Sequence, residues 1–367
     1  MTANATSRGH VWPDTGPISA TMRAVTFREF GGPEVLHLET VETPDCGPTD
    51  VLIRVAAVSV GRVLDLAARS GHHPSATFTF PHILGAEHAG VVAAIGSEVT
   101  GFSVGDHVAV FPVLTDPDCP VARAGDDELS PTVRIIGIDV AGADADYTAV
   151  PAANVFAVPD GVTPADAVAV ALGGVVGMNQ LLRAGYRTGQ RVIVQGATSA
   201  LGSTTALLAR HLGARLVVTS RREAKRARLR ELGFDHVLDS ASATFVEDVR
   251  AVFDGEGADI VINNLGDPAL WSNGIATLAP GGAMVSSGAF LGKTVPLDLQ
   301  RLYTLGQRII GVRTGNKLAA ARLWNEVRAG FRGVVDRTFA LEQASQAHDY
   351  VESSANVGRV ALVPNAP

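Results

Sequence analysis

The stretch RVIVQGATSALGSTTALLARHLGARLVVTSRR, residues 191 to 222, decides the fold of this chain. Arg191 to Gln195 is a short apolar, β-branched run of the kind that forms a buried parallel strand. Leu201 to Leu212 then has apolar residues at helical spacing, and Gly213 favours the end of that helix. Because Leu216 to Ser220 predicts a second strand, the stretch predicts one strand–helix–strand unit of a parallel sheet.

The turn between the first strand and the helix consists of small residues, Gly196 to Gly202. Small side chains let backbone N–H groups and the positive end of a helix approach a pyrophosphate closely. Ala197 and Ser199 depart from the G-x-G-x-x-G pattern, so an ordinary βα turn is the alternative. We predict that the pyrophosphate of a dinucleotide is bound by Ser199, Ala200, Leu201 and Gly202.

The end of the second strand distinguishes between the two nicotinamide dinucleotides. An NAD-selective fold has an acidic residue there for the ribose 2′-hydroxyl, whereas this chain has Ser220, Arg221 and Arg222. Arginine N–H donors match phosphate oxygens, so the predicted cofactor is NADPH. The alternative is a solvated basic helix, which is our interpretation of Lys225, Arg226, Arg228 and Arg230.

The same alternation continues along the chain. Further strands are predicted at 236–239, 258–264, 283–287 and 308–313, with helices near 243–253 and 268–278. Six strands that alternate with helices predict an α/β Rossmann fold with a doubly wound parallel sheet. Ligands of such sheets lie across the carboxyl ends of the strands. The cofactor-binding prediction therefore includes Asn264, Leu265, Gly266, Ser287, Gly288 and Ala289.

Length and composition fit two domains, and the charge balance argues against a nucleic-acid-binding protein. The chain has 367 residues, of which 46% are hydrophobic. It carries 30 Lys and Arg against 37 Asp and Glu, a net charge of −7, which argues against nucleic acid as a partner. Two cysteines, Cys46 and Cys119, are too few for a disulfide framework and fit a cytoplasmic location.

Neither the N-terminal residues nor the most apolar stretch of the chain predicts a membrane segment. Residues 1–21 lack the basic-then-apolar pattern of a signal peptide and are interpreted as an irregular extension. The most apolar stretch, Ala165 to Leu182, contains Asp166, Asn179 and Gln180. It predicts a buried or domain-linking helix, so we expect no membrane partner.

Residues 23–150 have short alternating or β-branched runs, which predict a barrel-like β domain. Within and beyond them, the order of several motifs resembles the medium-chain dehydrogenase/reductase superfamily, most closely its zinc-independent quinone oxidoreductase and enoyl reductase branch. The resemblance covers about Met22 to Val363. It rests on the stretch 191–222 and on FGGPEV (30–35), VLIRVAA (51–57), RSG (69–71), ILGAEHAGVV (83–92) and VGDHV (104–108).

This resemblance implies a GroES-like β-barrel catalytic domain, at residues 22–154 and 311–367, into which a Rossmann NADP(H)-binding domain at 155–310 is inserted. It also implies a homodimer formed through the exposed sheet edge near Ala283 to Ser287. The small-molecule substrate would be bound beside the cofactor.

The resemblance also allows the family's catalytic zinc ligands to be checked one at a time. The family's first cysteine falls at Arg62, its histidine at Ala86 and its later cysteine near Leu172. None of these residues offers a thiolate, imidazole or carboxylate, so no metal is predicted. The lobe from Phe111 to Tyr147, which holds a structural zinc in many relatives, has only Cys119. The spacing of His72, His73, His82 and His88 matches no metal motif, and we interpret them as independent.

Two residues are candidates for catalysis. Arg62 stands where reductases of the family commonly have asparagine, so it is expected to face the nicotinamide and bind a carboxylate, phenolate or enolate. An ion pair with Asp65 or Glu87 is the alternative. His73, in Gly71-His72-His73, stands where related enoyl reductases have a tyrosine acid, and an imidazolium could donate the proton. A solvent-facing loop histidine is its alternative.

These features predict an NADPH-dependent, zinc-independent reductase of quinones or of α,β-unsaturated ketones or thioesters. A carbon conjugated to a carbonyl accepts hydride without a metal, because the electron pair ends on an oxygen that N–H or O–H donors stabilise. Two alternatives stay open. One is a metal-free carbonyl or imine reductase, and the other is a non-catalytic NADPH-binding interaction or sensor protein.

Overall fold

The computed structural model describes residues 11–73 and 78–364. It divides into two compact units. The barrel unit consists of the described residues up to Leu172 together with those from Val335 onward, and the parallel-sheet unit is Gly173–Val334.

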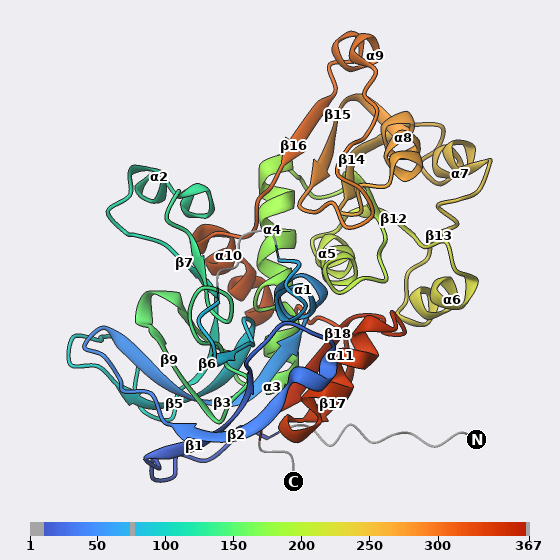
Figure 1. The fold of residues 1–367 in the computed structure, drawn as a ribbon. Coiled ribbons are helices and arrows are strands. Elements are labelled where there is room, and N and C mark those ends of the chain that lie inside the picture. Colours follow the sequence, from blue (N-terminus) through green and yellow to red (C-terminus); the bar gives the residue numbers. More distant parts are fainter. Residues whose placement is uncertain (1–10, 74–77, 365–367) are drawn as a thin grey trace. The chain divides into compact units, whose positions relative to one another are not determined.

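The parallel-sheet unit contains one six-stranded sheet in the order β13-β12-β11-β14-β15-β16 (Figure 1). All neighbouring strands are parallel. This confirms the predicted doubly wound sheet, whose order reverses between β11 and β14. The strands are β11 (Arg191–Gln195), β12 (Arg215–Thr219), β13 (Val237–Leu238), β14 (Ala258–Asn263), β15 (Leu278–Ser286) and β16 (Arg308–Gly311).

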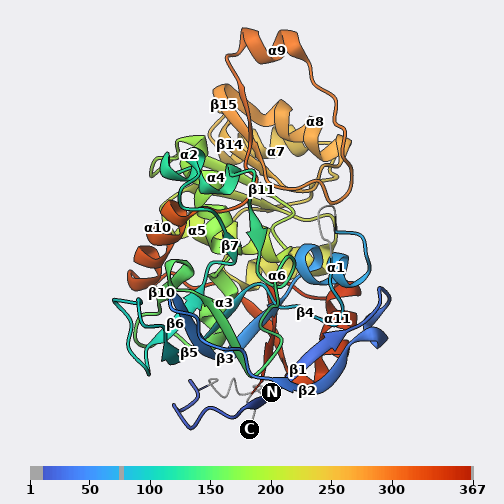
Figure 2. The same ribbon diagram turned by 60° about the vertical axis from the view of Figure 1, so that its left-hand side comes forward.

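Helices cover both faces of this sheet (Figures 1 and 2). On one side, α4 (Gly173–Ala184) packs against α5 (Ala200–His211) and α10 (Lys317–Arg328). On the other, α7 (Phe245–Val252) packs against α8 (Pro268–Thr277), which contacts β14 and β15. The remaining helices are α6 (Glu223–Glu231), which contacts β13, and α9 (Leu299–Thr304). Apolar side chains of the strands and of α7 and α8 form a continuous core between them.

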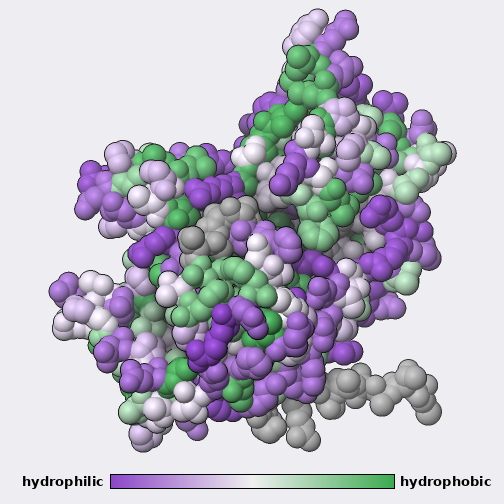
Figure 3. Space-filling view, in the orientation of Figure 1, coloured by the Kyte–Doolittle hydropathy of each residue, from purple (hydrophilic) through white to green (hydrophobic). Residues whose placement is uncertain are grey.

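The outer edge of the sheet differs from the sequence prediction. Residues 283–287 were expected at the exposed edge, but β16 pairs with β15 on that side and is itself the edge strand. β15 also begins earlier than predicted, at Leu278, because Pro280 to Gly282 are accommodated by a shift of register against β14. Figure 3 shows apolar surface near α9 and this edge, where Tyr303 and Leu299 are 73% and 65% exposed.

The barrel unit is built mainly from antiparallel strands. Its largest sheet has the order β10-β6-β5-β3-β18-β17, with β9 paired to β3, and a second sheet has the order β2-β1-β4. The strands are β1 (Thr21–Phe27), β2 (His37–Glu42), β3 (Asp50–Val60), β4 (His82–Ile83), β5 (His88–Ile95), β6 (His107–Val110), β7 (Val113–Leu114), β8 (Arg134–Ile135), β9 (Tyr147–Pro151), β10 (Val155–Ala157), β17 (Val335–Ala340) and β18 (Arg359–Val363). β7 and β8 pair with each other.

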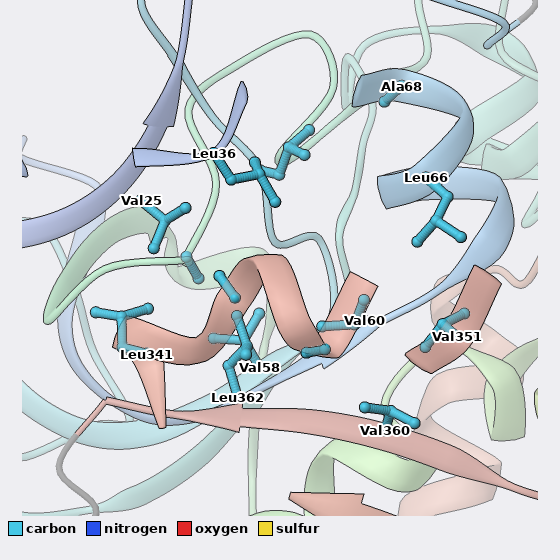
Figure 4. Packing of buried hydrophobic residues seen from close by; sticks show 14 of the residues in the cluster. Val25, Leu36, Val58, Val60, Leu66, Ala68, Leu341, Val351, Val360 and Leu362 are labelled. Carbon is cyan, nitrogen blue, oxygen red and sulfur yellow. The ribbon is translucent and has the colours of Figure 1, made fainter. Parts of the chain in front are cut away.

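The helices of the barrel unit are short. They are the single-turn segments η1 (Pro33–Val35), η3 (Asp127–Leu129), η4 (Ala152–Asn154) and η5 (Leu341–Gln343), the π-helix η2 (Arg62–Leu66), and α1 (Ala67–Arg69), α2 (Pro120–Arg123), α3 (Pro164–Val170) and α11 (Ala344–Glu352). Val25, Val58, Leu66, Val351 and Leu362 belong to one buried cluster that joins both ends of the chain (Figure 4). The C-terminal segment is therefore part of the barrel core.

The unit boundaries differ from the predicted boundaries at 154/155 and 310/311. They lie at 172/173 and 334/335 because helices, and not only strands, decide which residues pack together. α3 packs on β3, β5 and β18 of the barrel unit, whereas α10 packs on α4 of the parallel-sheet unit. The predicted single helix 165–182 is two helices, α3 and α4, separated by a turn at Ala171 and Leu172.

Among the described residues, one helical segment, Pro164–Ala184, is long and apolar enough to cross a membrane by length and composition. However, 89% of its most apolar window is buried inside the protein, as in a core helix. This agrees with the interpretation of the stretch as a buried or linking helix.

Residues 11–20 have no helix or strand, as predicted for the extension, and residues 1–10 lie outside the described part. The extension is nevertheless attached to the barrel unit. The Trp12 indole stacks on His107 at 4.3 Å between ring centroids, and its Nε1 donates to Val162 O at 3.0 Å. Arg54 Nη2 donates to the backbone oxygen of Gly16 at 3.1 Å.

Candidate functional site

The turn after β11 presents the beginning of α5. Ser199 is the N-cap, and its Oγ accepts a hydrogen bond from Gly202 N at 3.0 Å. Gly202 approaches the backbone so closely that an added Cβ would lie 2.3 Å from Gly196 O. Gly196 itself has a φ of 67°, which glycine adopts without strain. The first turn of α5 therefore offers backbone N–H groups and a positive helix end to an anion.

The parallel sheet brings the other predicted cofactor residues to the same edge. Residues 220–222 follow β12, residues 264–266 follow β14, and residues 287–289 follow β15. Asn263 Oδ1 accepts hydrogen bonds from Leu265 N and Gly266 N at 3.0 and 3.1 Å, which fixes the turn after β14. Whether each of these residues contacts the dinucleotide stays a prediction.

The turn after β12 leaves Arg221 and Arg222 exposed, whereas Ser220 is buried. The interpretation of Arg226 as part of a solvated helix face is wrong, because its side chain is only 13% exposed. Its Nη1 donates to Ser220 O at 2.9 Å and pairs with Asp239 Oδ2 at 2.9 Å. Arg226 therefore joins the turn after β12 to the end of β13, and the Asp239 carboxylate is already neutralised by it.

The other basic residues of α6 behave more as predicted. Arg228 is exposed and pairs with Glu231 at 2.7 Å, and Arg230 is exposed and pairs with Glu223 at 2.8 Å. Such surface pairs contribute little to stability.

Sequence reasoning missed one residue at this edge, Gln180 of α4. It is fully buried, and its Nε2 donates to Asn264 Oδ1 and to Ser287 Oγ, both at 2.8 Å. The only signal in the sequence was a polar residue within the apolar stretch 165–182.

In the barrel unit, Arg62 begins the π-helix η2 and contacts the end of α11. Its Nη2 donates to the backbone oxygens of Val351 and Glu352 and to Ser354 Oγ at 2.5 Å. Carbonyl groups at the end of a helix lack helical partners and carry negative partial charge, so a guanidinium stabilises them. Burial lowers the pKa of Arg62, while the negative charge of Glu352 opposes this effect.

The carboxylate of Glu87, an alternative partner predicted for Arg62, pairs instead with Arg359 at 2.8 Å. Both side chains are buried. Burial raises the pKa of Glu87, and the charge of Arg359 acts in the opposite direction. Asp65, the other alternative partner, accepts a hydrogen bond at its Oδ2 from Gly61 N at 2.7 Å.

Asp65 and Asp144 are two further carboxyl groups buried in the barrel unit. Burial raises the pKa of Asp65 to about 7, although backbone N–H groups of Gly61 and Gly85 oppose it. Burial and the negative charge of Asp65 also raise the pKa of Asp144 well above its usual range. Asp144 Oδ1 is buried without a hydrogen-bond partner among the described residues. Burial therefore disfavours the charged form of both carboxyl groups.

His73 is half-buried, and burial lowers its pKa below the usual value, with the charge of Asp139 opposing the effect. The neutral imidazole is then the main form near pH 7, which argues against the predicted imidazolium donor. A neutral ring still has one N–H donor.

The other histidines have separate partners. His82 Nε2 contacts Gly137 O, His88 Nδ1 contacts Ala86 O, and His72 Nδ1 contacts Ser70 Oγ. Within residues 11–73 and 78–364, no group of three or more His, Cys, Asp or Glu side chains could hold a metal ion.

The three positions at which the family resemblance places zinc ligands do not have side chains that fit that metal. The Arg62 guanidinium is a donor only and binds the end of α11. Ala86 and Leu172 are buried apolar side chains. Since zinc needs thiolate, imidazole or carboxylate ligands, these residues provide none.

Each of the two units contains a region that matches a known protein family. Residues 47–160 match the alcohol dehydrogenase GroES-like domain family, and residues 200–329 match the zinc-binding dehydrogenase family. An NAD-dependent alcohol dehydrogenase of Sulfurisphaera tokodaii is 30% identical over 94% of this chain and 100% of its own.

Solved structures show the same similarity. A cobalt- and zinc-bound thermostable alcohol dehydrogenase from Pyrobaculum aerophilum is 32% identical, with a TM-score of 0.82 over 94% of this chain and 100% of its own. The 2-octenoyl-CoA carboxylase reductase CinF, in complex with NADP and 2-octenoyl-CoA, has a TM-score of 0.81 over 96% of this chain and 90% of its own. At 24% identity, that similarity shows the fold alone.

The buried carboxyl pair generates a prediction about pH. Asp65 has a raised pKa in the folded state, so between its ordinary value of 3.8 and about 7 the folded protein binds more protons than the unfolded chain. Stability contributed by this pair is therefore present at low pH and is lost as the pH rises to about 7. Asp144→Asn replaces one carboxyl by a neutral amide and should raise the melting temperature at pH 8 by roughly 2–6 °C.

Differential scanning calorimetry between pH 5 and 8 measures this effect. Asp349→Asn, which removes an exposed carboxylate of α11, is the control and should leave the pH dependence of the wild type unchanged. A melting temperature for Asp144→Asn that is lower than that of the wild type at pH 8 would contradict the assignment.

Proposed function

Because the chain belongs to the medium-chain dehydrogenase/reductase superfamily of oxidoreductases, we propose that it is an NADPH-dependent, zinc-independent reductase of conjugated carbonyl compounds. The acceptor would be a quinone or an α,β-unsaturated ketone or thioester. A bound nicotinamide dinucleotide supplies the hydride in such a reaction. The chain's own residues would bind the cofactor, orient the acceptor and stabilise the charge that develops on its oxygen.

This proposal rests on the side chains of Arg62, Ala86 and Leu172, none of which can be a zinc ligand. Direct reduction of a ketone by members of this superfamily that use zinc depends on a metal that polarises the carbonyl oxygen. These three residues offer no lone pair to a metal, so the proposed acceptor is one that does not need it. In a conjugated acceptor, hydride adds to the β-carbon and the electron pair moves to the carbonyl oxygen, where hydrogen-bond donors can stabilise it.

Metal-free carbonyl reduction is the second candidate function. It is favoured by the name of the Sulfurisphaera tokodaii relative, an NAD-dependent alcohol dehydrogenase. Hydride would then add to the carbonyl carbon itself. The two functions differ in which acceptor is turned over.

The proposed cofactor is NADPH, although that relative is named as NAD-dependent. No carboxylate follows β12 directly, and Asp239, at the neighbouring end of β13, is paired with Arg226 at 2.9 Å. Arg221 and Arg222 are exposed at the end of β12, where a 2′-phosphate would be read. These features favour a 2′-phosphate over a 2′-hydroxyl.

Arg62 and His73 are the proposed residues of the acceptor site. The backbone oxygens at the end of α11 hold the guanidinium of Arg62 in place, and from there it would orient the carbonyl of the acceptor. The neutral imidazole of His73 would donate an N–H to the developing enolate oxygen, and the carbon would take its proton from water. We also propose a cytoplasmic homodimer that pairs through the β16 edge.

The acceptor test uses a cyclic enone, its saturated ketone and a quinone, with NADPH oxidation followed at 340 nm before and after treatment with a chelator. We expect turnover of the enone or quinone at an unchanged rate after chelation, and rates at least about tenfold lower with the saturated ketone. Turnover of the saturated ketone at the rate of the enone would favour the second candidate. NADPH binding without turnover of any acceptor would favour the non-catalytic alternative.

The cofactor preference is tested with Arg221→Ala and Arg222→Ala. Loss of a charge-assisted hydrogen bond to phosphate should weaken NADPH binding by about tenfold or more and leave NADH binding nearly unchanged. Titration of the cofactor's fluorescence measures both dissociation constants. Arg228→Ala is the control, because Arg228 is an exposed arginine of α6, the helix that follows Arg221 and Arg222, and it pairs with Glu231. Equal losses for NADPH and NADH would rule out a 2′-phosphate contact.

A further inference from the structure

The ends of β14 and β15 are joined by a polar network in the parallel-sheet unit. Asn264 Oδ1 accepts one hydrogen bond from Ser287 N at 2.9 Å and another from Gln180 Nε2 at 2.8 Å. Gln180 Nε2 also donates to Ser287 Oγ at 2.8 Å. Three residues that are far apart in the sequence therefore share one set of hydrogen bonds: one lies in α4, one directly follows β14 and one directly follows β15.

This network determines which way the amide of Asn264 faces. Oxygen and nitrogen of an amide are assigned from their partners, and a backbone N–H can only donate. The atom that meets Ser287 N must therefore be Oδ1. The orientation of Gln180 is consistent with this, because Thr205 Oγ1 donates to its Oε1 at 3.4 Å, which leaves Nε2 to face Asn264.

Both donors of the Asn264 amide are then left for a ligand. Two hydrogen bonds occupy Oδ1, and no acceptor for Nδ2 is present in the part of the chain that the structure describes. Asn264 itself is half-buried. A fixed amide with two available N–H groups at the carboxyl edge of a sheet is suited to bind an oxygen acceptor.

The order of the strands indicates which half of the dinucleotide lies near Asn264. The pyrophosphate turn follows β11, and the residues proposed to read the adenosine ribose follow β12 on one side of it. β14 and β15 lie on the opposite side of β11. Since the two halves of a dinucleotide bind on opposite sides of the switch point, β14 and β15 belong to the half that binds the nicotinamide riboside.

We propose that Asn264 Nδ2 donates a hydrogen bond to a neutral oxygen of the nicotinamide riboside, either a ribose hydroxyl or the carboxamide oxygen. Gln180 is a positioning residue that acts through Asn264. This proposal deepens the proposed use of a nicotinamide cofactor, and it depends neither on the 2′-phosphate nor on the acceptor that is reduced.

The test compares an intact cofactor with the same molecule without nicotinamide. Isothermal titration calorimetry is performed with NADPH and 2′-phospho-ADP-ribose, or with NADH and ADP-ribose if the wild type binds NADH more tightly. Asn264→Leu should weaken binding of the intact cofactor by about tenfold, the loss expected for one hydrogen bond and a misplaced partner. Binding of the truncated ligand should stay within about twofold.

Two further variants separate positioning from general damage. Gln180→Met keeps a long side chain but removes the donor to Asn264, and it should give the same selective loss at a smaller fold-change. Asn273→Leu is the matched control, because Asn273 lies on α8 in the same unit and donates to Ser240 O at 3.4 Å. It should leave the affinity for both ligands unchanged.

Three results decide the proposal. A selective loss for the intact cofactor supports it, whereas equal losses for both ligands, or no loss for either, overturn it. If Asn264→Leu does not fold, Asn264→Asp is used instead, because it retains Oδ1 and removes the Nδ2 donor. The result is then the ratio of its affinities for the intact and the truncated cofactor, compared with the same ratio for the wild type. With the thionicotinamide cofactor, a smaller effect of the substitution assigns the carboxamide oxygen, and an unchanged effect assigns the ribose. Failure of enone turnover would leave these binding results unaffected.

Discussion

The parallel direction of the six strands is the constraint on which the candidate site depends. Parallel strands end at the same edge of the sheet, so segments that follow β11, β12, β14 and β15 meet although they are spread over nearly a hundred residues of sequence. The register is reinforced at this edge, where Asn263 Nδ2 donates to Gln195 Oε1 at 2.6 Å across the central pair of strands. Every residue proposed to bind the dinucleotide takes its position from this arrangement.

The barrel unit buries several ionisable side chains. Glu87 and Arg359 neutralise each other at 2.8 Å, whereas burial raises the pKa of both Asp65 and Asp144. Arg62 uses its charge at the carbonyl end of α11. At the three positions where the family resemblance places zinc ligands, this chain has a guanidinium that binds the end of α11 and two apolar side chains, Ala86 and Leu172. These side chains are the physical basis for proposing an acceptor that needs no metal.

Local patterns in the sequence predicted the sheet well because strand and helix periods, and the small residues from Gly196 to Gly202, are properties of neighbouring residues. Contacts between distant residues could not be predicted. Arg62 meets Glu352 across 290 positions, and Gln180 meets Asn264 across 84. Arg226 was misinterpreted for the same reason, since a helix pattern does not reveal the carboxylate of Asp239. The unit boundaries depend on how α3 and α10 pack, which single-sequence periodicity does not contain.

The carbon of the acceptor that receives the hydride distinguishes metal-free conjugate reduction from reduction of the carbonyl group. Protein is first depleted of zinc to below about one zinc ion per hundred protein molecules. It is then incubated with a cyclic enone and with NADPH that carries deuterium at the transferred C4 position, and the product is analysed by deuterium NMR. We expect deuterium at the β-carbon of a saturated ketone. Deuterium at the carbonyl carbon of an allylic alcohol, or transfer that appears only after zinc is added, would contradict it.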